Sequence, residues 1–213
     1  MDLDGIDTNA MREALTRIGS FTRVFGGVRA VRRRLRSYPN ASLLDVGAGD
    51  VSLLNQLRSE SNGRPWVGVD SHRDVARVAA RSAKPHLGVC VIRADGKALP
   101  FRDRSFDVVI SMLTLHHLDD HGAVQLLSEM ARVARRAIYV WDLERSAVAL
   151  GGALALAHTV WRRDPLVRHD APLSVRRAFT VAELGDRARD AGLGRVRVRR
   201  VWPARLELSA TAS

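Results

Sequence analysis

The chain has 213 residues, a length that fits one domain with a full apolar core. Hydrophobic residues make up 46% of it. The longest apolar run, Ala147–Trp161, is interrupted by two glycines and a histidine and is shorter than the roughly 20 residues of a membrane-spanning helix. These properties exclude a membrane-spanning protein.

The formal net charge of +11 raises the question of nucleic-acid binding. Nearly all the basic residues are arginines, and they are scattered apart from two clusters, Arg32–Arg34 and Arg195–Arg200. The second cluster alternates with valines, which is the pattern of a strand with one wet face. We therefore attribute the charge to composition and do not expect nucleic acid as the main partner.

The N-terminus and the cysteine content favour a cytoplasmic protein. Met1–Asp4 lacks the basic and apolar regions of a signal peptide. Cys90, the single cysteine, lies in an apolar strand-like run and is expected in the core. We therefore predict neither a disulfide framework nor a metal site.

The first 40 residues predict a helical flank or lid ahead of the first strand. Thr8 is positioned to cap a short helix whose apolar face runs from Met11 to Ile18. After two glycines, a second apolar stripe predicts a helix over Val28–Arg36.

In the central part of the chain, apolar strand-like runs alternate with helical patterns. The runs predict five strands, over Ser42–Gly47, Trp66–Val69, Gly88–Arg93, Phe106–Ser111 and Ala137–Asp142. The periodicity between them predicts helices over Val51–Ser61, His72–Ser82 and Ala123–Ala134. Near-continuous valine, isoleucine and leucine is typical of parallel strands covered on both faces, so the pattern predicts an open α/β sheet.

The remainder of the chain predicts an insertion and a closing hairpin. An apolar helix is expected over Ser146–Arg162, followed by a polar loop over Arg168–Ser174. Thr180 and Glu183 form a capping box that opens a further helix. The last two strands, joined by a link short enough only for an antiparallel hairpin, are expected over Arg195–Val201 and Arg205–Ser209.

Three carboxylates follow the first three predicted strands. Asp45 ends the first strand beside Gly47, Asp70 ends the second, and Asp95 follows the third. Because parallel strands present their carboxyl ends at one edge of a sheet, these side chains are expected to line one crevice. A carboxylate after the second strand can accept hydrogen bonds from both ribose hydroxyls, and one after the third can accept from an adenine amine. The pattern predicts a site for a nucleoside cofactor.

The glycine turn discriminates between two such cofactors. The NAD fingerprint, G-x-G-x-x-G, brings a pyrophosphate onto a helix N-terminus. Residues 47–52 read G-A-G-D-V-S, so the third glycine is absent and Asp50 puts negative charge where the diphosphate would lie. An acidic turn suits a cationic ligand, and S-adenosylmethionine carries a sulfonium and an ammonium group.

Five motifs in order resemble the class I S-adenosylmethionine-dependent methyltransferases. They are Leu44–Gly49, Val69–Asp70, Arg93–Phe101, Ser105–Val109 and Leu113–Leu118. The last three resemble the small-molecule branch that contains the ubiquinone and menaquinone biosynthesis methyltransferases. The resemblance covers about Ser42–Asp142 and implies a Rossmann-like α/β fold. That fold has a seven-stranded, mostly parallel sheet with an antiparallel final strand, helices on both faces, N-terminal helices and a helical cap after strand five.

On this resemblance the chain is one methyltransferase domain. Its parts are a flank or lid over residues 1–40, a cofactor-binding core over 41–142, a cap or substrate insertion over 143–179, and a last helix and hairpin over 180–213. The implied cofactor-binding residues are Asp45, Gly47 and Gly49 for the methionine part, Asp70 for the ribose, Asp95 and Gly96 for the adenine, and Leu113 near the sulfur. Ser71, next to Asp70, is also expected to bind the cofactor. Many family members carry a third glycine where this chain has Val51, and a valine there is expected to crowd the turn.

The resemblance implies direct displacement, in which an acceptor nucleophile attacks the methyl carbon in line with the departing sulfur. A phenolic acceptor, with a reference pKa of about 10, needs a base near neutral pH. The candidate bases are His116, His117, Asp142 and His169. Each has a structural alternative. The histidine pair can bond the backbone or line the pocket, Asp142 can cap the next helix, and His169 with Asp170 can form a surface turn.

The apolar segment Ala147–Trp161 is either a helix packed on the sheet or a cap over an apolar acceptor such as a quinone, a phenolic lipid or a polyketide aromatic. With Arg162 and Arg163 beside it, it could also contact a membrane surface. We therefore expect methylation of a small aromatic or lipid-like acceptor at oxygen or carbon. The alternatives are an RNA methyltransferase and a non-catalytic accessory protein that binds the cofactor. The oligomeric state stays open.

Overall fold

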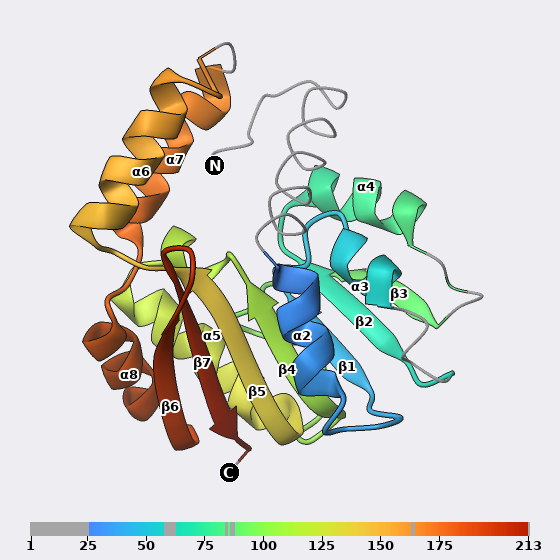
Figure 1. Cartoon of the computed structure of the whole chain (residues 1–213). Coiled ribbons are helices and arrows are strands. Elements are labelled where there is room, and N and C mark those ends of the chain that lie inside the picture. The colour runs from blue at the N-terminus through green and yellow to red at the C-terminus, as the bar shows by residue number, and fades with distance from the viewer. Residues whose placement is uncertain (1–25, 58–62, 84, 86–87, 163–164, 213) are drawn as a thin grey trace.

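A seven-stranded sheet forms the centre of the molecule (Figure 1). The computed structural model describes residues 26–57, 63–83, 85, 88–162 and 165–212. The strands are β1 Leu43–Val46, β2 Trp66–Asp70, β3 Val89–Arg93, β4 Phe106–Met112, β5 Ala134–Leu143, β6 Gly194–Val201 and β7 Arg205–Thr211. Their order is β3-β2-β1-β4-β5-β7-β6, and β7 runs antiparallel to both of its neighbours. This arrangement confirms the predicted fold class.

Helices cover both faces of the sheet (Figure 1). One face carries α2 Gly27–Leu35, α3 Ser52–Leu57 and α4 Arg73–Ser82, and the other carries α5 Asp120–Val133 and α8 Val181–Asp190. Each face has its own apolar cluster. The consecutive residues Leu43 and Leu44 belong to different clusters, because successive side chains of a strand point to opposite faces. Burial on both sides explains the near-continuous apolar runs of the central strands.

The strand β3 lies at one edge of the sheet and is covered less than the strands beside it. It pairs with β2, and most of its residues are partly or fully exposed. Cys90 is exposed, so the prediction of a core cysteine is wrong. The apolar run around Cys90 has the composition of a buried strand, but its place at the edge leaves one flank open to solvent.

The insertion after β5 is a helical hairpin. Its helices are α6 Ala147–His158 and α7 Pro165–Arg177. The predicted polar loop over Arg168–Ser174 is therefore wrong. Pro172 lies inside α7, although proline in a helix interior costs about 3 kcal/mol. Packing between the two helices, in which Ala149 and Ala153 meet Val175, offsets that cost.

Side-chain caps confirm the predicted first turns of two helices and show that a third helix begins earlier than predicted. Thr180 Oγ1 accepts from the Glu183 amide at 3.3 Å, and the Glu183 carboxylate accepts from the Thr180 amide at 2.8 Å, so the capping box of α8 is present. The helix α4 begins after His72, as predicted. The helix α5 begins earlier than predicted because Asp119 accepts from the Gly122 amide at 2.8 Å.

The helix α2 packs on the face of the sheet as a flank. Val31 and Leu35 join the apolar cluster beneath it, and Arg34 lies over the Tyr139 ring at 5.2 Å. The helix predicted to begin at Thr8 lies outside the described residues, so a lid stays a prediction. Within the ranges described, none of the helices is both long and apolar enough to cross a membrane.

Candidate cofactor-binding edge

The turn after β1 crosses the carboxyl edge of the sheet. Gly47 and Gly49 have φ angles of 77° and 56°, which glycine adopts at the least cost. The amides of Gly47 and Ala48 both donate to the Val69 carbonyl, at 2.8 and 2.9 Å, and tie the turn to β2. A Cβ on Gly47 would lie 2.2 Å from Thr114 Oγ1. Glycine at this position is therefore required by both conformation and space.

Val51 keeps a left-handed backbone at the place where many family members have a third glycine. Its φ is 53° and its side chain is fully buried, although this region is unfavourable for a β-branched residue. Gly68 of β2 makes the room, since a Cβ there would lie 2.7 Å from Val51 Cγ1. The valine therefore packs into the sheet, and the crowding expected at the turn is accommodated by Gly68.

Asp45, near the end of β1, is a buried carboxylate with an unused oxygen. Its side chain is 2% exposed, and among the described residues no donor lies within hydrogen-bond distance of Oδ1. Burial first, and then the charge of Asp70, raise its pKa to about 7. A positive charge placed beside Oδ1 would offset this desolvation, so the site suits a cation.

Asp70 at the end of β2 is held by two backbone amides. Its Oδ2 accepts from Gly49 at 3.2 Å and its Oδ1 from His72 at 2.9 Å. Burial raises its pKa, and the two amides oppose that shift. A carboxylate can accept about four hydrogen bonds, so Asp70 keeps lone pairs for ribose hydroxyls. Ser71 follows it with an exposed side chain, and its carbonyl accepts from Arg93 Nε at 3.2 Å.

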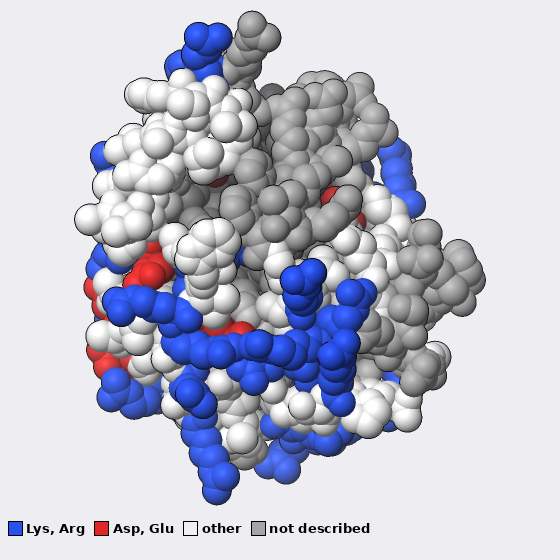
Figure 2. Space-filling model, in the orientation of Figure 1, with Lys and Arg blue, Asp and Glu red and all other residues white. Residues whose placement is uncertain are grey.

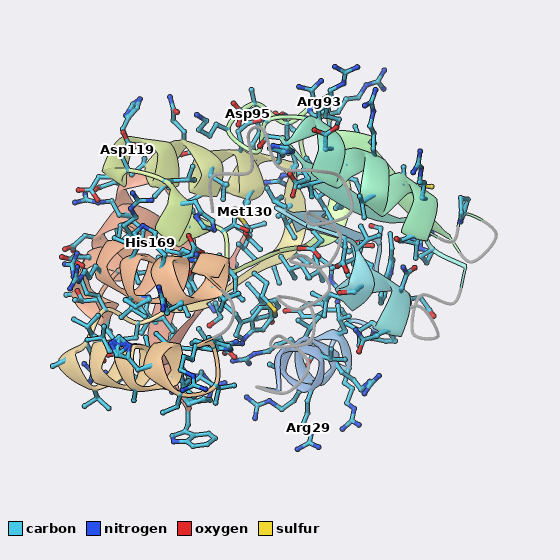
Figure 3. The ribbon with its side chains drawn as sticks, turned by 90° about the horizontal axis from the view of Figure 1, so that it is seen from above. Arg29, Arg93, Asp95, Asp119, Met130 and His169 are labelled. Atoms are coloured by element: carbon cyan, nitrogen blue, oxygen red, sulfur yellow. The ribbon has the colours of Figure 1, made fainter. Side chains whose placement is uncertain are left out.

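Asp95 and Gly96 follow β3 at the same edge. Seen from above, Asp95 lies between α4 and α5 (Figure 3). Asp95 is exposed, accepts from the Lys97 amide at 2.9 Å, and lies 3.8 Å from Lys97 Nζ. Gly96 packs against the end of β1, since a Cβ there would lie 2.8 Å from Val46 Cγ1. The structure thus brings the ends of β1, β2 and β3 together at one edge, as the sequence predicted.

Leu113 continues this edge past β4. Its φ of 56° is in the left-handed region, at a cost of order 1–3 kcal/mol for a residue with a side chain. Its amide donates to the Trp141 carbonyl at 2.8 Å. The following Thr114 packs on Gly47, so Leu113 lies next to the glycine turn.

Asp142 near the end of β5 is saturated with donors. Its Oδ2 accepts from the amides of Thr114 at 3.1 Å and Leu115 at 2.7 Å, and its Oδ1 accepts from the Leu143 amide at 2.7 Å. Oδ1 also lies 2.6 Å from His116 Nδ1. Burial would raise the pKa of Asp142, but His116 and the amides hold it below its usual value. This geometry favours a charged Asp142 carboxylate that orients His116. It does not favour Asp142 as the base that accepts the acceptor's proton.

Two of the four candidate bases are joined directly. His116 is buried and bonded to Asp142, whereas the neighbouring His117 reaches the surface. The two imidazole rings lie 4.0 Å apart between centroids. Partial desolvation, followed by the proximity of His116, lowers the pKa of His117 to about 4, so His117 is neutral near pH 7.

His169 is exposed on α7 (Figure 3), the helix that packs against the segment of His116 and His117. The side chain of Asp170 lies 3.4 Å from the Ser174 hydroxyl, which donates to it. Consecutive helix residues point about 100° apart, so His169 and Asp170 do not form a base with its orienting partner. Within the part of the chain that the structure describes, His169 has neither a hydrogen bond nor an ion pair.

Two residues at this edge were not singled out from the sequence. Thr114 closes over Gly47 and gives its amide to Asp142. Arg205, at the start of β7, is buried; burial lowers its pKa, and the charge of Asp142 opposes the shift. A signal existed for Arg205, because it and Glu207 alternate with leucines and therefore share one face of the strand.

Comparison with known proteins identifies the domain built on this edge. Residues 43–137 match the model of a family described as methyltransferase domain. This segment, just under half of the chain, is similar to a methyltransferase domain. An uncharacterized protein of Mycobacterium tuberculosis is 29% identical over 152 residues, which are 70% of this chain and 53% of that protein. Probable tRNA methyltransferase 9B of Bos taurus is 31% identical over 112 residues, 50% of this chain and 23% of that protein. The chain therefore spans about half or less of the length of these relatives.

Solved structures share the fold over nearly the whole chain. A SAM-dependent methyltransferase from Aquifex aeolicus has a TM-score of 0.72 at 20% identity, covering 98% of this chain and 100% of that one. Human N-acetylserotonin methyltransferase in complex with SAM has a TM-score of 0.71 at 15% identity, covering 100% of this chain and 60% of that one. These two structures confirm the fold, and with the family match over residues 43–137 they support S-adenosylmethionine as the cofactor. The ubiquinone-like branch stays a prediction.

The residues at the edge fit this cofactor. The unpartnered Oδ1 of Asp45 offers a place for a positive charge, and Asp70 keeps acceptors for hydroxyl groups. The turn at Gly47 lets a ligand approach the backbone closely.

Proposed function

We propose that this protein transfers the methyl group of S-adenosylmethionine to a small aromatic or lipid-like acceptor, at an oxygen or a ring carbon. The observation that carries the methyl-donor side is Asp45, buried beside the glycine turn with Oδ1 free of any described donor. The uncharged helix α6 of the hairpin after β5 supports an apolar acceptor. The hairpin packs on the His116 segment through α7.

Each residue at the edge then has a defined task. When bound, the cofactor supplies an electrophilic methyl group on a positively charged sulfur. Asp45 offsets the positive charge of the methionine part, and Asp70 binds the ribose. Asp95 accepts from the adenine amine, and the bulk of Leu113 borders the sulfur end. The protein contributes mainly alignment, which is worth up to about 7–11 kcal/mol.

When the acceptor is a hydroxyl group, His116, oriented by Asp142, is proposed to take up its proton. The 2.6 Å contact supports a role in which Asp142 binds the Nδ1–H and leaves Nε2 of His116 as the acceptor. His117 and His169 stay candidate bases, and His116 is preferred because of its contact with Asp142.

The test combines binding with transfer. Calorimetry should detect binding of S-adenosylmethionine and of its demethylated product. Radiolabelled cofactor should then label phenols and hydroquinones, and much less bulk RNA. Failure to bind either form of the cofactor would contradict the proposal, and binding without transfer to any acceptor would leave the accessory-protein alternative.

RNA is the second candidate acceptor. It is supported by the net charge of +11 and by relatives such as the tRNA methyltransferase of Bos taurus. It predicts tight binding to RNA that weakens steeply as salt rises. Labelling of RNA in preference to the small aromatics would replace the first candidate by this one.

A further inference from the structure

Exposed apolar side chains gather around α6. Of the five large apolar side chains that the described residues expose, four lie on or next to this helix. Val148 is 84% exposed, Leu154 40%, Val160 71%, and Trp202 in the β6–β7 turn 87%. Trp202 belongs here because Ala204 of the same turn packs against the α6–α7 cluster.

The distribution of side chains on α6 differs from that of a helix that covers a sheet, which buries its large apolar side chains. Its buried residues are the small Ala149, Ala153 and Ala157, and the first two pack with α7. Of its larger apolar residues, Val148 and Leu154 are exposed, whereas Leu150 and Leu156 are partly buried. No residue between Ala147 and His158 carries a carboxylate, an ammonium or a guanidinium group. A helix in water normally turns a polar face to solvent, so α6 presents a surface that still requires an apolar partner.

A band of arginines lies beside α6 on the same face of the molecule (Figure 2). It joins α2 to β6, because Arg34 and Arg199 both bind the buried Glu207. Their neighbours Arg29 and Arg197 are exposed, and no acidic partner is found for either among the described residues. Seen from above, α6 and the outward-pointing Arg29 of α2 lie on the same side of the sheet (Figure 3).

We propose that this face, made by α6, Trp202 and the arginine band of α2 and β6, docks on the surface of a bilayer that contains anionic phospholipids. Headgroup phosphates match the arginines, and the acyl boundary matches the apolar side chains of α6. Tryptophan is enriched at such interfaces because its ring is apolar and its N–H is polar. A nucleic acid would satisfy the arginines and leave α6 uncovered. A second copy would bring two bands of like charge together.

The test uses the full chain without cofactor, so it does not depend on methyl transfer. In co-sedimentation, the protein should bind vesicles of equimolar phosphatidylcholine and phosphatidylglycerol, and bind pure phosphatidylcholine more weakly. Leu154→Glu should reduce the binding by about tenfold or more, since it puts a charge at the acyl boundary. Ile92→Glu is the matched control, because Ile92 is 37% exposed on the opposite edge strand, and it should bind as wild type.

Two double variants, each of which removes two positive charges, test the arginine band. Arg29→Gln with Arg197→Gln should lower affinity for the anionic vesicles by about 25-fold, from about fivefold per arginine near the surface. The control pair, Arg73→Gln with Arg81→Gln, lies on α4 and should have little effect. Circular dichroism checks that all variants fold.

Three results would overturn the proposal. They are equal losses in test and control pairs, no binding to anionic vesicles, and a dimer in light scattering that Leu154→Glu dissociates. If Arg29→Gln with Arg197→Gln instead weakens binding to single-stranded RNA while vesicles are not bound, the band is a nucleic-acid surface.

Discussion

Replacing Asp45 by asparagine tests the cofactor edge most directly. The carboxylate is 2% exposed, its Oδ1 has no described donor, and burial followed by the charge of Asp70 raises its pKa from 3.8 to about 7. The charged form is therefore costly in the absence of a ligand, and a cation at this place relieves the cost. Asp45→Asn keeps the shape of the side chain and removes the charge.

The shift sets the sign and size of a pH effect on stability. Because the folded state binds this proton more tightly than the unfolded state, Asp45 favours folding at low pH, and that contribution is lost as pH rises from about 4 to 7. At ~1.4 kcal/mol per pKa unit, the loss is about 4 kcal/mol. Asp45→Asn should remove this slope. Above pH 7 the variant should be more stable than wild type by up to about 4 kcal/mol.

Binding of the cofactor should show the opposite trend. A cation favours the ionised carboxylate, so wild-type affinity should rise up to about tenfold per pH unit between pH 5 and 7. The cofactor's own ammonium, with a reference pKa near 8, stays charged over that range. Urea unfolding and calorimetry with S-adenosylmethionine measure the two trends. The control is Asp50→Asn in the same turn, whose Oδ1 accepts from the Ser52 amide at 3.0 Å, and it should keep both trends.

Two results would refute this reasoning. Equal pH slopes of unfolding in wild type and Asp45→Asn would mean that the carboxylate is not destabilised by burial. Wild-type affinity for the cofactor in Asp45→Asn at pH 7 would mean that Asp45 meets no positive charge.

Three further changes test the neighbouring contacts. Asp70→Ala should weaken cofactor binding by at least about tenfold in calorimetry, since charge-assisted hydrogen bonds are lost; unchanged affinity would place the ribose elsewhere. Gly68→Ala should destabilise the fold by about 1–3 kcal/mol in urea unfolding because the new methyl overpacks Val51. The loss should shrink in a Val51→Gly background, and strictly additive losses would contradict the contact. Asp142→Asn should lower kcat more than it raises KM and shift the pH profile of methyl transfer, because His116 loses its charged partner; an unchanged profile would leave Asp142 a structural role only.

The strand and helix pattern was readable because it depends on local periodicity. The apolar runs that end at Asp45 and Asp70 are strands with the predicted ends to within a residue or two. The capping box at Thr180 needs only residues three apart. Such features depend on near neighbours, so a single sequence suffices to find them.

Predictions were wrong where packing between residues distant in the chain determines the local structure or the burial. The loop predicted around Pro172 is a helix because α6 packs along it. Cys90 is exposed because β3 lies at an edge of the sheet. The sequence does not distinguish the two cases, since central and edge strands can have the same apolar composition. Val51 keeps its left-handed backbone because Gly68, on another strand, leaves it room.

The sequence by itself determined the α/β architecture and the acidic edge, because strand ends and the glycine turn are adjacent in the chain, and it predicted S-adenosylmethionine as the cofactor. Only the tertiary structure decided which candidate bases meet. The bond between His116 and Asp142 joins residues 26 positions apart, and it exists because β4 and β5 are neighbours in the sheet. It also decided that α6 buries Ala149, Ala153 and Ala157 and exposes Val148 and Leu154, because burial depends on which helix packs against it.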